Sequence, residues 1–217
     1  MAVVPFSLMW SDLLILGLCW TVYGTAHSVL VAPSVAKWVK QWWGAAAAYY
    51  RLTYNVVSIV GLIPILWFSA SIHVSPILEW VWPYTLIQYL CWALGILIFV
   101  LGMRAYDGRD FVGLRQVAAY RAGSHDMAPP VLTISGIHRV VRHPWYLALL
   151  LLLWARDVSA VTLVTNGVLT AYLFVGTHFE ERKLVAAFGG SYREYQDTVS
   201  MFFPIKWLNH LVASTKT

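Results

Sequence analysis

A cluster of cationic and aromatic side chains surrounds a proline about two thirds of the way along the chain. Arg142 and His143 come directly before Pro144, and Tyr146 follows it. Proline suits the first position of a helix, so His143 is expected at the cap and Arg142 just outside. Free N–H groups at a helix start bind anions, and neighbouring cations strengthen that binding. The pattern predicts a site for a carboxylate or phosphate, although Arg and His also anchor helices at membrane borders.

A second polar cluster follows the last long apolar segment. Glu180 and Glu181 are adjacent, and Tyr192 and Tyr195 come shortly after them. Adjacent residues on a helix point about 100° apart, so at most one carboxylate faces the interior. A carboxylate at a membrane border is costly unless a cation compensates it. The alternative is a pair of solvated charges beside Arg182.

A third cluster joins the end of the first apolar segment to the start of the second. His27 and Ser28 belong to the former, and Tyr50, Arg51 and Asn55 to the latter. Arg51 and Asn55 are four residues apart and share a helix face. An unperturbed histidine changes its charge near neutral pH, so His27 is a candidate proton acceptor. The simpler reading is a histidine packed between helices.

A fourth cluster, Asp110, Arg115 and Gln116, lies in a polar stretch at residues 104–143. A connection of this length inside a compact domain is usually functional or disordered. Arg115 either supports a site or contacts lipid headgroups.

The segments between these clusters are apolar. Hydrophobic residues make up 59% of the 217 residues and charged residues only 12%, against about 25% charged in soluble domains. Four segments have the roughly 20 residues needed to cross a bilayer: 6–31, 53–70, 85–103 and 158–177. The chain is therefore predicted to be an all-α integral membrane protein. Cys19 and Cys91 lie within apolar segments, where packing roles are expected.

The basic residues predict the topology, because Lys and Arg collect in cytoplasmic loops. Fourteen of the 15 lie on one side if the amino terminus is outside and the carboxyl terminus is cytoplasmic. Residues 145–177 must then form a hairpin, with Arg156 at its tip. Its first arm, residues 145–155, is too short to span, at about 17 Å.

The expected fold is about five helices in one membrane domain, residues 1–217. Residues 1–103 form three transmembrane helices, residues 104–143 a cytoplasmic loop, and residues 144–217 the hairpin and tail. This topology predicts that all four clusters meet at the cytoplasmic face. The net charge of +5 suits anionic lipid headgroups and is no argument for nucleic acid. No obligate protein partner and no metal are inferred.

The ordered run Arg142-His143-Pro144-x-Tyr146, Glu180-Glu181-x-x-Leu184 and Phe188-Gly189-x-x-Tyr192-x-x-Tyr195 resembles the isoprenylcysteine carboxyl methyltransferase superfamily of small membrane enzymes. The amino-terminal half is similar to its bacterial methanethiol S-methyltransferase and NnrU-like branch. His27-Ser28-Val29-Leu30, Tyr49-Tyr50-Arg51-Leu52 and the run from Asp110 to Gln116 carry that second likeness. One departure is Ala148, where the superfamily usually has glycine.

The resemblance implies S-adenosylmethionine as the methyl donor. The implied cofactor-binding residues are Arg142, His143, Pro144, Tyr146, Glu180, Glu181, Tyr192 and Tyr195. Arg142, His143 and the helix start at Pro144 suit the donor carboxylate, and a glutamate suits its ammonium or ribose. A tyrosine face attracts the sulfonium.

The favoured acceptor is a small thiol, methanethiol, which would become dimethyl sulfide. Only a few per cent of a thiol with a pKa near 8.5 is ionised at pH 7, so a base is useful. His27 is the first candidate base and His143 the second, while Arg51 or Arg115 would stabilise the thiolate. The expected substrate-binding residues are Ser28, Tyr50, Asn55, Asp110 and Gln116.

Three alternatives remain open at the level of sequence. The acceptor could be an isoprenylcysteine, a phospholipid or another lipid-soluble molecule that enters from the bilayer. The chain could instead be a non-catalytic NnrU-like membrane accessory protein, or a haem carrier that uses His27 and His143. For the favoured reading, the expected location is a bacterial inner membrane, with the active site on the cytoplasmic side.

Overall fold

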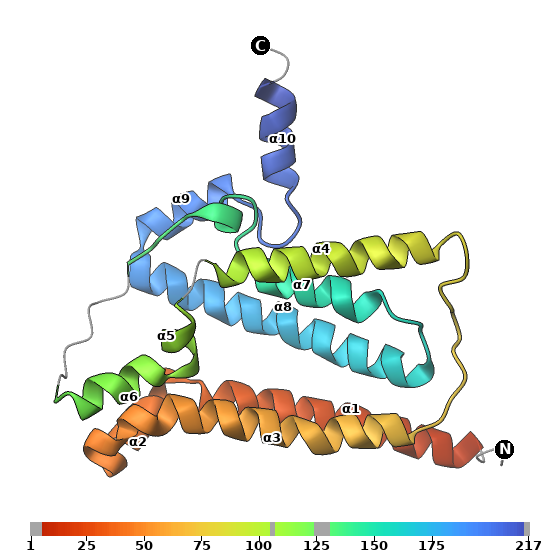
Figure 1. Cartoon of the computed structure of the whole chain (residues 1–217), viewed down its shortest axis with the longest axis horizontal. Coiled ribbons are helices and arrows are strands. Elements are labelled where there is room, and N and C mark those ends of the chain that lie inside the picture. The colour runs from red at the N-terminus through yellow and green to blue at the C-terminus, as the bar shows by residue number, and fades with distance from the viewer. Residues whose placement is uncertain (1–5, 105–106, 124–130, 215–217) are drawn as a thin grey trace. The chain divides into compact units, whose positions relative to one another are not determined.

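A computed structural model describes residues 6–104, 107–123 and 131–214 of the chain (Figure 1). Every regular element in these ranges is helical, which confirms the predicted class. Four helices are long and apolar enough to cross a membrane; they are α1 (Phe6–Leu30), α3 (Tyr50–Ser71), α4 (Thr85–Met103) and α8 (Ala160–Phe188). They coincide with the four predicted apolar segments, so the chain has the make-up of a multi-pass membrane protein.

The chain divides into two compact units and passes between them several times. The first unit contains residues 6–79, 107–123 and 157–172, and the second contains residues 80–104, 131–156 and 173–214. Helix α8 begins in the first unit and ends in the second. The prediction of a single membrane domain was made from topology alone and stays a prediction.

The first unit is built on α1 and α3, which run alongside each other (Figure 1). The start of α8 packs against this pair, and Trp20 Nε1 donates to Thr165 Oγ1 at 3.1 Å. Gly24 makes the approach possible, since a Cβ there would lie 2.9 Å from the Tyr172 ring. The core of the unit comes from all three helices: Leu13, Leu16, Trp20, Ile65 and Val161.

Short helices complete the first unit. Helix α2 (Pro33–Trp43) starts on a proline, and η1 (Gly44–Tyr49) connects it to α3. The predicted loop 104–143 is partly helical, because it contains α5 (Gly108–Val112) and α6 (Leu114–Arg121). Gly113 joins them with φ +97°, a left-handed conformation that favours glycine, and a Cβ there would lie 3.0 Å from the backbone of Leu52.

In the second unit, α4 holds α7 (Pro144–Trp154) in a groove lined by small residues. A Cβ on Gly102 would lie 2.6 Å from Cδ1 of Trp145, and one on Gly95 would lie 3.2 Å from the Ala148 carbonyl oxygen. Ala148 is fully buried in this contact. The Ala148 methyl group, which departs from the superfamily pattern, therefore packs between α7 and α4. The glycine in this helix contact is Gly95, on α4.

The rest of the second unit is formed by shorter segments that come before and after α7. It consists of the end of α8, η2 (Gly136–Arg139), α9 (Gly190–Thr198) and α10 (Ile205–Ser214). A short parallel bridge fixes the segment before α7, because the Arg142 N–H donates to the Ser200 carbonyl at 2.9 Å and the His143 N–H to the Met201 carbonyl at 3.0 Å. This bridge sets the position of the Arg142 and His143 side chains.

The two arms of the predicted hairpin correspond to α7 and α8, and the second arm is longer than predicted. The short hairpin arm expected at residues 145–155 is α7, an 11-residue helix at Pro144–Trp154. The arm expected at 158–177 continues as a helix to Phe188. Charges at residues 180–183 mark the end of the apolar segment and not of the helix, since Glu, Arg and Lys are good helix formers. The orientation of the helices across the membrane stays a prediction.

Candidate functional site

The residues of the Arg142 cluster come together around one buried carboxylate, that of Glu181. Arg142 Nε donates to Glu181 Oε1 at 2.9 Å, and Nη2 donates to Oε2 at 3.0 Å. Both side chains are buried, with 7% and 8% of their surface exposed. Bidentate pairs of this kind are strong and geometrically specific.

Arg142 also binds the end of α9. Its Nη1 donates to the carbonyls of Gln196 and Val199, and the Lys206 ammonium donates to the carbonyls of Gln196 and Asp197 at 2.7 and 2.9 Å. The last carbonyls of a helix lack partners within it and carry partial negative charge, so cations there are favourable. Arg142 thus joins α8 and α9 to the start of α7.

Three more side chains, those of His143, Tyr192 and Gln196, add further hydrogen bonds to Glu181. Oε1 receives them from His143 Nε2 at 2.7 Å and Tyr192 Oη at 2.9 Å, and Oε2 receives one from Gln196 Nε2. A carboxylate only accepts, so His143 must carry a hydrogen on Nε2. With five donors against roughly four lone-pair positions, the Glu181 carboxylate is saturated.

Glu180 precedes Glu181 on α8, points in a different direction and is 43% exposed. Its Oε2 accepts from the Tyr146 hydroxyl at 2.8 Å, and the Tyr146 ring stacks on His143 with centroids 5.4 Å apart and planes 3° apart. The expectation that only one of the two glutamates faces the interior is confirmed. Glu180 keeps acceptor capacity that Glu181 has used.

An open hollow of about 480 Å³ adjoins this network. One face of α8 lines it, together with Gln196 and Met201 from the residues that follow. The α8 residues are His178, Glu181, Arg182, Val185 and Ala186, and Arg142 completes the lining. The volume falls within the range of about 300–1,000 Å³ that is common for small-molecule and cofactor sites.

Burial sets the proton affinity of two groups near the network. Tyr192 is 2% exposed, and burial, followed by its hydrogen bond to Glu181, raises the pKa of its hydroxyl. Burial also lowers the pKa of His138, and the neighbouring His143 lowers it further. Tyr195 donates to the His138 carbonyl at 2.6 Å. Tyr192 therefore stays protonated and acts as a donor.

The second expected group of residues forms around His27 in the first unit. Tyr54 Oη lies 2.8 Å from His27 Nε2, and Ser58 Oγ lies 3.3 Å from Nδ1. The rings of Tyr23, Tyr54 and Tyr172 lie around the imidazole, with centroids 6.1, 5.2 and 6.5 Å away. This side chain is thus held by hydroxyl groups on both nitrogens, inside an aromatic enclosure.

Two expected substrate-binding residues help to hold this region together. The Ser28 hydroxyl lies 3.0 Å from the Tyr172 hydroxyl, which joins α1 to α8. Tyr50 donates to the Leu30 carbonyl at 2.6 Å. Both contacts fix the end of α1 on which His27 lies.

The fourth cluster packs against the start of α3. Asn55 Nδ2 donates to the Val112 carbonyl at 3.0 Å, and Arg51 Nη1 donates to the Asp110 carbonyl at 2.9 Å. Gln116 Nε2 donates to Asp110 Oδ1 at 2.7 Å. The structure therefore brings the third and fourth clusters together, as their predicted topology requires.

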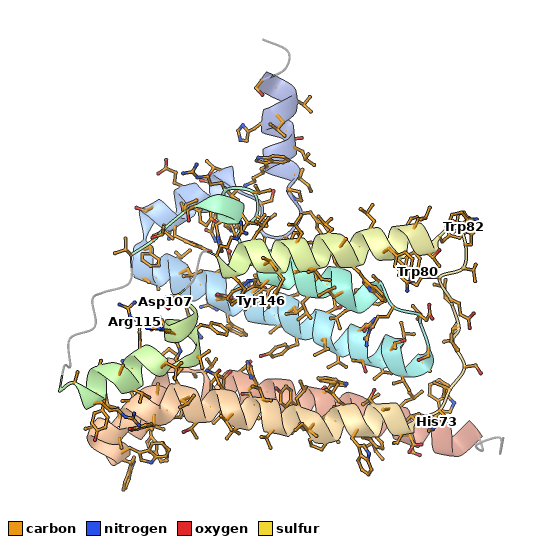
Figure 2. The ribbon with its side chains drawn as sticks, viewed as in Figure 1. His73, Trp80, Trp82, Asp107, Arg115 and Tyr146 are labelled. Carbon is orange, nitrogen blue, oxygen red and sulfur yellow. The ribbon has the colours of Figure 1, made fainter. Side chains whose placement is uncertain are left out.

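Arg115 lies at the edge of this cluster and faces Asp107, as Figure 2 shows. Their ion pair measures 3.2 Å between Arg115 Nη1 and Asp107 Oδ2, and the side chains are 63% and 48% exposed. Exposed pairs contribute little, about 0–1 kcal/mol. Arg115 is thus available to a neighbouring charge, while Arg51 is tied to the α5 backbone.

Sequence reasoning missed three groups that complete these sites. Tyr54 and Ser58 contact His27, and a signal was present, because Tyr50, Tyr54 and Ser58 follow one another at four-residue spacing on one face of α3. Gln196, on α9, contacts Glu181. It lies four residues after Tyr192 on the same helix face, which is a weaker signal.

Relatives of known activity align with most of the chain. Methanethiol S-methyltransferase 2 of Bradyrhizobium diazoefficiens is 31% identical over 192 residues, covering 85% of this chain and 70% of the relative. The methanethiol S-methyltransferase of Pseudomonas deceptionensis is 29% identical, with coverage of 92% and 74%. That of Mycobacterium tuberculosis is 28% identical, with coverage of 84% and 74%.

No family model and no solved structure matches the chain. The relatives nevertheless define the class, which is the membrane methyltransferases similar to isoprenylcysteine carboxyl methyltransferase. Within that class, the chain belongs to the methanethiol S-methyltransferase family. Both predicted resemblances are thereby confirmed, and the chain is a methyltransferase.

Proposed function

We propose that this protein transfers a methyl group from S-adenosylmethionine to methanethiol and releases dimethyl sulfide. The observation that carries the proposal is the likeness to several methanethiol S-methyltransferases over 84–92% of the chain. The His27 enclosure supports it, because a thiol acceptor needs help to lose its proton.

The residues around the hollow fit the proposed donor. S-adenosylmethionine combines a charged amino acid end with an apolar and aromatic remainder, and the lining combines Arg182, His178 and Gln196 with Val185, Ala186 and Met201. When bound, it supplies a methyl group on a cationic sulfur, which an aligned thiolate takes in a single displacement. Alignment alone contributes several kcal/mol to such reactions.

In this scheme, the Glu181 network holds the donor site in shape. Arg142, His143 and Tyr192 fix the carboxylate, and through it the relative positions of α7, α8 and α9. Glu180 offers further acceptor capacity next to this network, because 43% of its side chain is exposed. We therefore assign Arg142 and Glu181 to preorganising the site, and Glu180 to accepting hydrogen bonds from the ligand.

His27 is the proposed base, and Tyr54 its relay. The Tyr54 hydroxyl is placed to give its proton to His27 Nε2 at 2.8 Å, while its oxygen accepts the proton of the thiol. The result is a thiolate and an imidazolium, and the imidazolium later returns its proton to water. Arg115, with its exposed guanidinium, is the proposed source of positive field for the thiolate.

The proposal includes an orientation, with the amino terminus outside and the carboxyl terminus in the cytoplasm. Fourteen of the 15 Lys and Arg residues are cytoplasmic only in that arrangement. A reporter active only in the periplasm should therefore be active before Met1 and silent after Thr217. Reporters that place both ends on one side would contradict the arrangement of three spanning helices and a hairpin. The relatives named above are bacterial, which supports a bacterial inner membrane.

The decisive experiment measures product from the purified chain in lipid nanodiscs. With S-adenosylmethionine carrying a labelled methyl group, methanethiol should yield labelled dimethyl sulfide in the headspace. A farnesylcysteine analogue and phosphatidylethanolamine test the lipid acceptors. Label in a lipid product with none in dimethyl sulfide would overturn the thiol assignment. Donor binding without any methylated product would instead support an accessory role.

A further inference from the structure

We infer that Arg182, assisted by Gln196, binds the amino acid end of the methyl donor, with Arg182 taking the carboxylate. The inference rests on the proposed function and deepens it. It replaces Arg142, the residue that the sequence pattern favours for the carboxylate, with a residue whose guanidinium is open to a ligand.

Arg142 has almost no capacity left for a ligand. A guanidinium offers five N–H donors, and four are directed at Glu181, Gln196 and Val199. Its charge is also compensated by Glu181, and 7% of its side chain is exposed. A second carboxylate at Arg142 would have to displace the buried Glu181 from its five donors.

Arg182 differs from Arg142 in both exposure and hydrogen bonding. It is exposed and lines the hollow next to Glu181. In the described part of the chain, no hydrogen bond or ion pair engages its guanidinium. With Arg142 and Glu181 cancelling, Arg182 leaves the lining with one excess positive charge. His178 lies one helical turn earlier and shares this face, so the hollow is suited to an anion.

Gln196 supplies the complementary group. Its Nε2 faces the Glu181 carboxylate, which can only accept, so the amide must be oriented with Oε1 directed elsewhere. Gln196 also lines the hollow. An amide oxygen and a guanidinium in the same lining match the ammonium and carboxylate of an amino acid zwitterion. The apolar residues Val185, Ala186 and Met201 leave the remaining wall for the rest of the donor.

The test compares two ligands that differ in this one end. S-adenosylhomocysteine carries the amino acid group, and 5′-methylthioadenosine lacks it. Isothermal titration of the full chain in nanodiscs gives both affinities for the parent, Arg182→Met, Arg182→Lys and the control Lys183→Met. An ionic hydrogen bond of this kind predicts a loss of about 10- to 100-fold for S-adenosylhomocysteine in Arg182→Met.

The other expected results separate the loss of a carboxylate contact from a general loss of ligand binding. Affinity for 5′-methylthioadenosine should be unchanged in Arg182→Met, Arg182→Lys should recover part of the loss, and Lys183→Met should match the parent. Equal S-adenosylhomocysteine affinity in parent and Arg182→Met would overturn the inference, and so would an equal loss for both ligands. A parent that binds neither ligand would contradict the proposed function itself.

Discussion

The Glu181 network and the His27 enclosure are both polar clusters among apolar helices, but they differ in charge and in saturation. Glu181 is ionically paired, accepts five hydrogen bonds and is 8% exposed on its side chain. His27 has hydroxyl partners only, at 2.8 and 3.3 Å, on its two nitrogens. In the Glu181 network, any rearrangement would break the ion pair between Arg142 and Glu181. In the His27 enclosure, protons can move between the hydroxyl groups and the imidazole without breaking an ion pair.

This difference indicates a division of labour. A buried ion pair that loses one partner leaves an uncompensated charge, so such networks hold structure in place and cannot easily take part in a reaction. Hydroxyl and imidazole groups exchange roles as donor and acceptor, which suits proton transfer. We therefore expect damage to the first cluster to appear in stability and binding, and damage to the second to appear in turnover.

The largest effect is expected for His27→Ala. Loss of a general base should slow turnover with methanethiol by about 10²–10⁴-fold at pH 7, while S-adenosylhomocysteine affinity stays near that of the parent. The deficit should shrink towards pH 9.5, because the ionised fraction of a thiol rises with pH and leaves less for a base to do. Turnover normalised to folded protein, measured from pH 6.5 to 9.5, tests both expectations.

A deficit that stays constant across that pH range would reject the base and leave a positioning role. A packed structural histidine predicts a third pattern, in which yield or thermal stability falls while turnover per folded molecule is preserved. At the upper limit of pH 9.5, most exposed tyrosines, with a pKa near 10, are still protonated.

Next in size is Glu181→Ala, which should lower the free energy of unfolding by about 3–5 kcal/mol, because Arg142 would be left buried and unpaired. Glu180→Ala is the matched control. It removes a carboxylate that is 43% exposed, so a loss below about 1 kcal/mol is expected. Denaturant unfolding in a mild detergent, followed by tryptophan fluorescence, compares the two. Equal losses would remove the distinction between the adjacent glutamates.

The smallest effects come from two Tyr→Phe changes that each delete one hydroxyl. Tyr192→Phe removes a hydrogen bond to a buried carboxylate and should cost about 1.5–3 kcal/mol of stability. Tyr54→Phe removes a neutral hydrogen bond to His27, so stability should change by no more than about 1.5 kcal/mol. Its turnover should nevertheless fall, since the relay is lost. If Tyr54→Phe were fully active, His27 would have to accept the thiol proton directly.

Much of the fold and part of the site follow from sequence patterns that are local. Helix α4 begins and ends at the predicted residues, because its apolar segment is bounded on both sides. His143 caps α7 and Pro144 opens it, as proline at the first helical position predicts. The different directions of Glu180 and Glu181 follow from helical geometry alone.

The remainder depends on distant pairs that periodicity does not encode. Arg142 and Glu181 are 39 residues apart, and both were expected to bind the donor because each has the right charge for it. Nothing in their local sequence indicates that they satisfy each other first. The proposed role of Arg182 was missed for the same reason. It follows only from the observation that Arg142 is already paired with Glu181.

The groove on α4 has a consequence for how this protein is made. Helix α7 has 11 residues, about half the length that crosses a bilayer, so it is a poor segment for insertion by itself. Gly95 and Gly102 lie seven residues apart on α4, which comes earlier in the chain, and form the surface against which α7 packs. Because α4 is synthesised before α7, its glycine surface is already present when the short helix α7 emerges from the ribosome. A bulky residue at Gly102 should therefore reduce the amount of inserted protein during synthesis, before any activity can be measured.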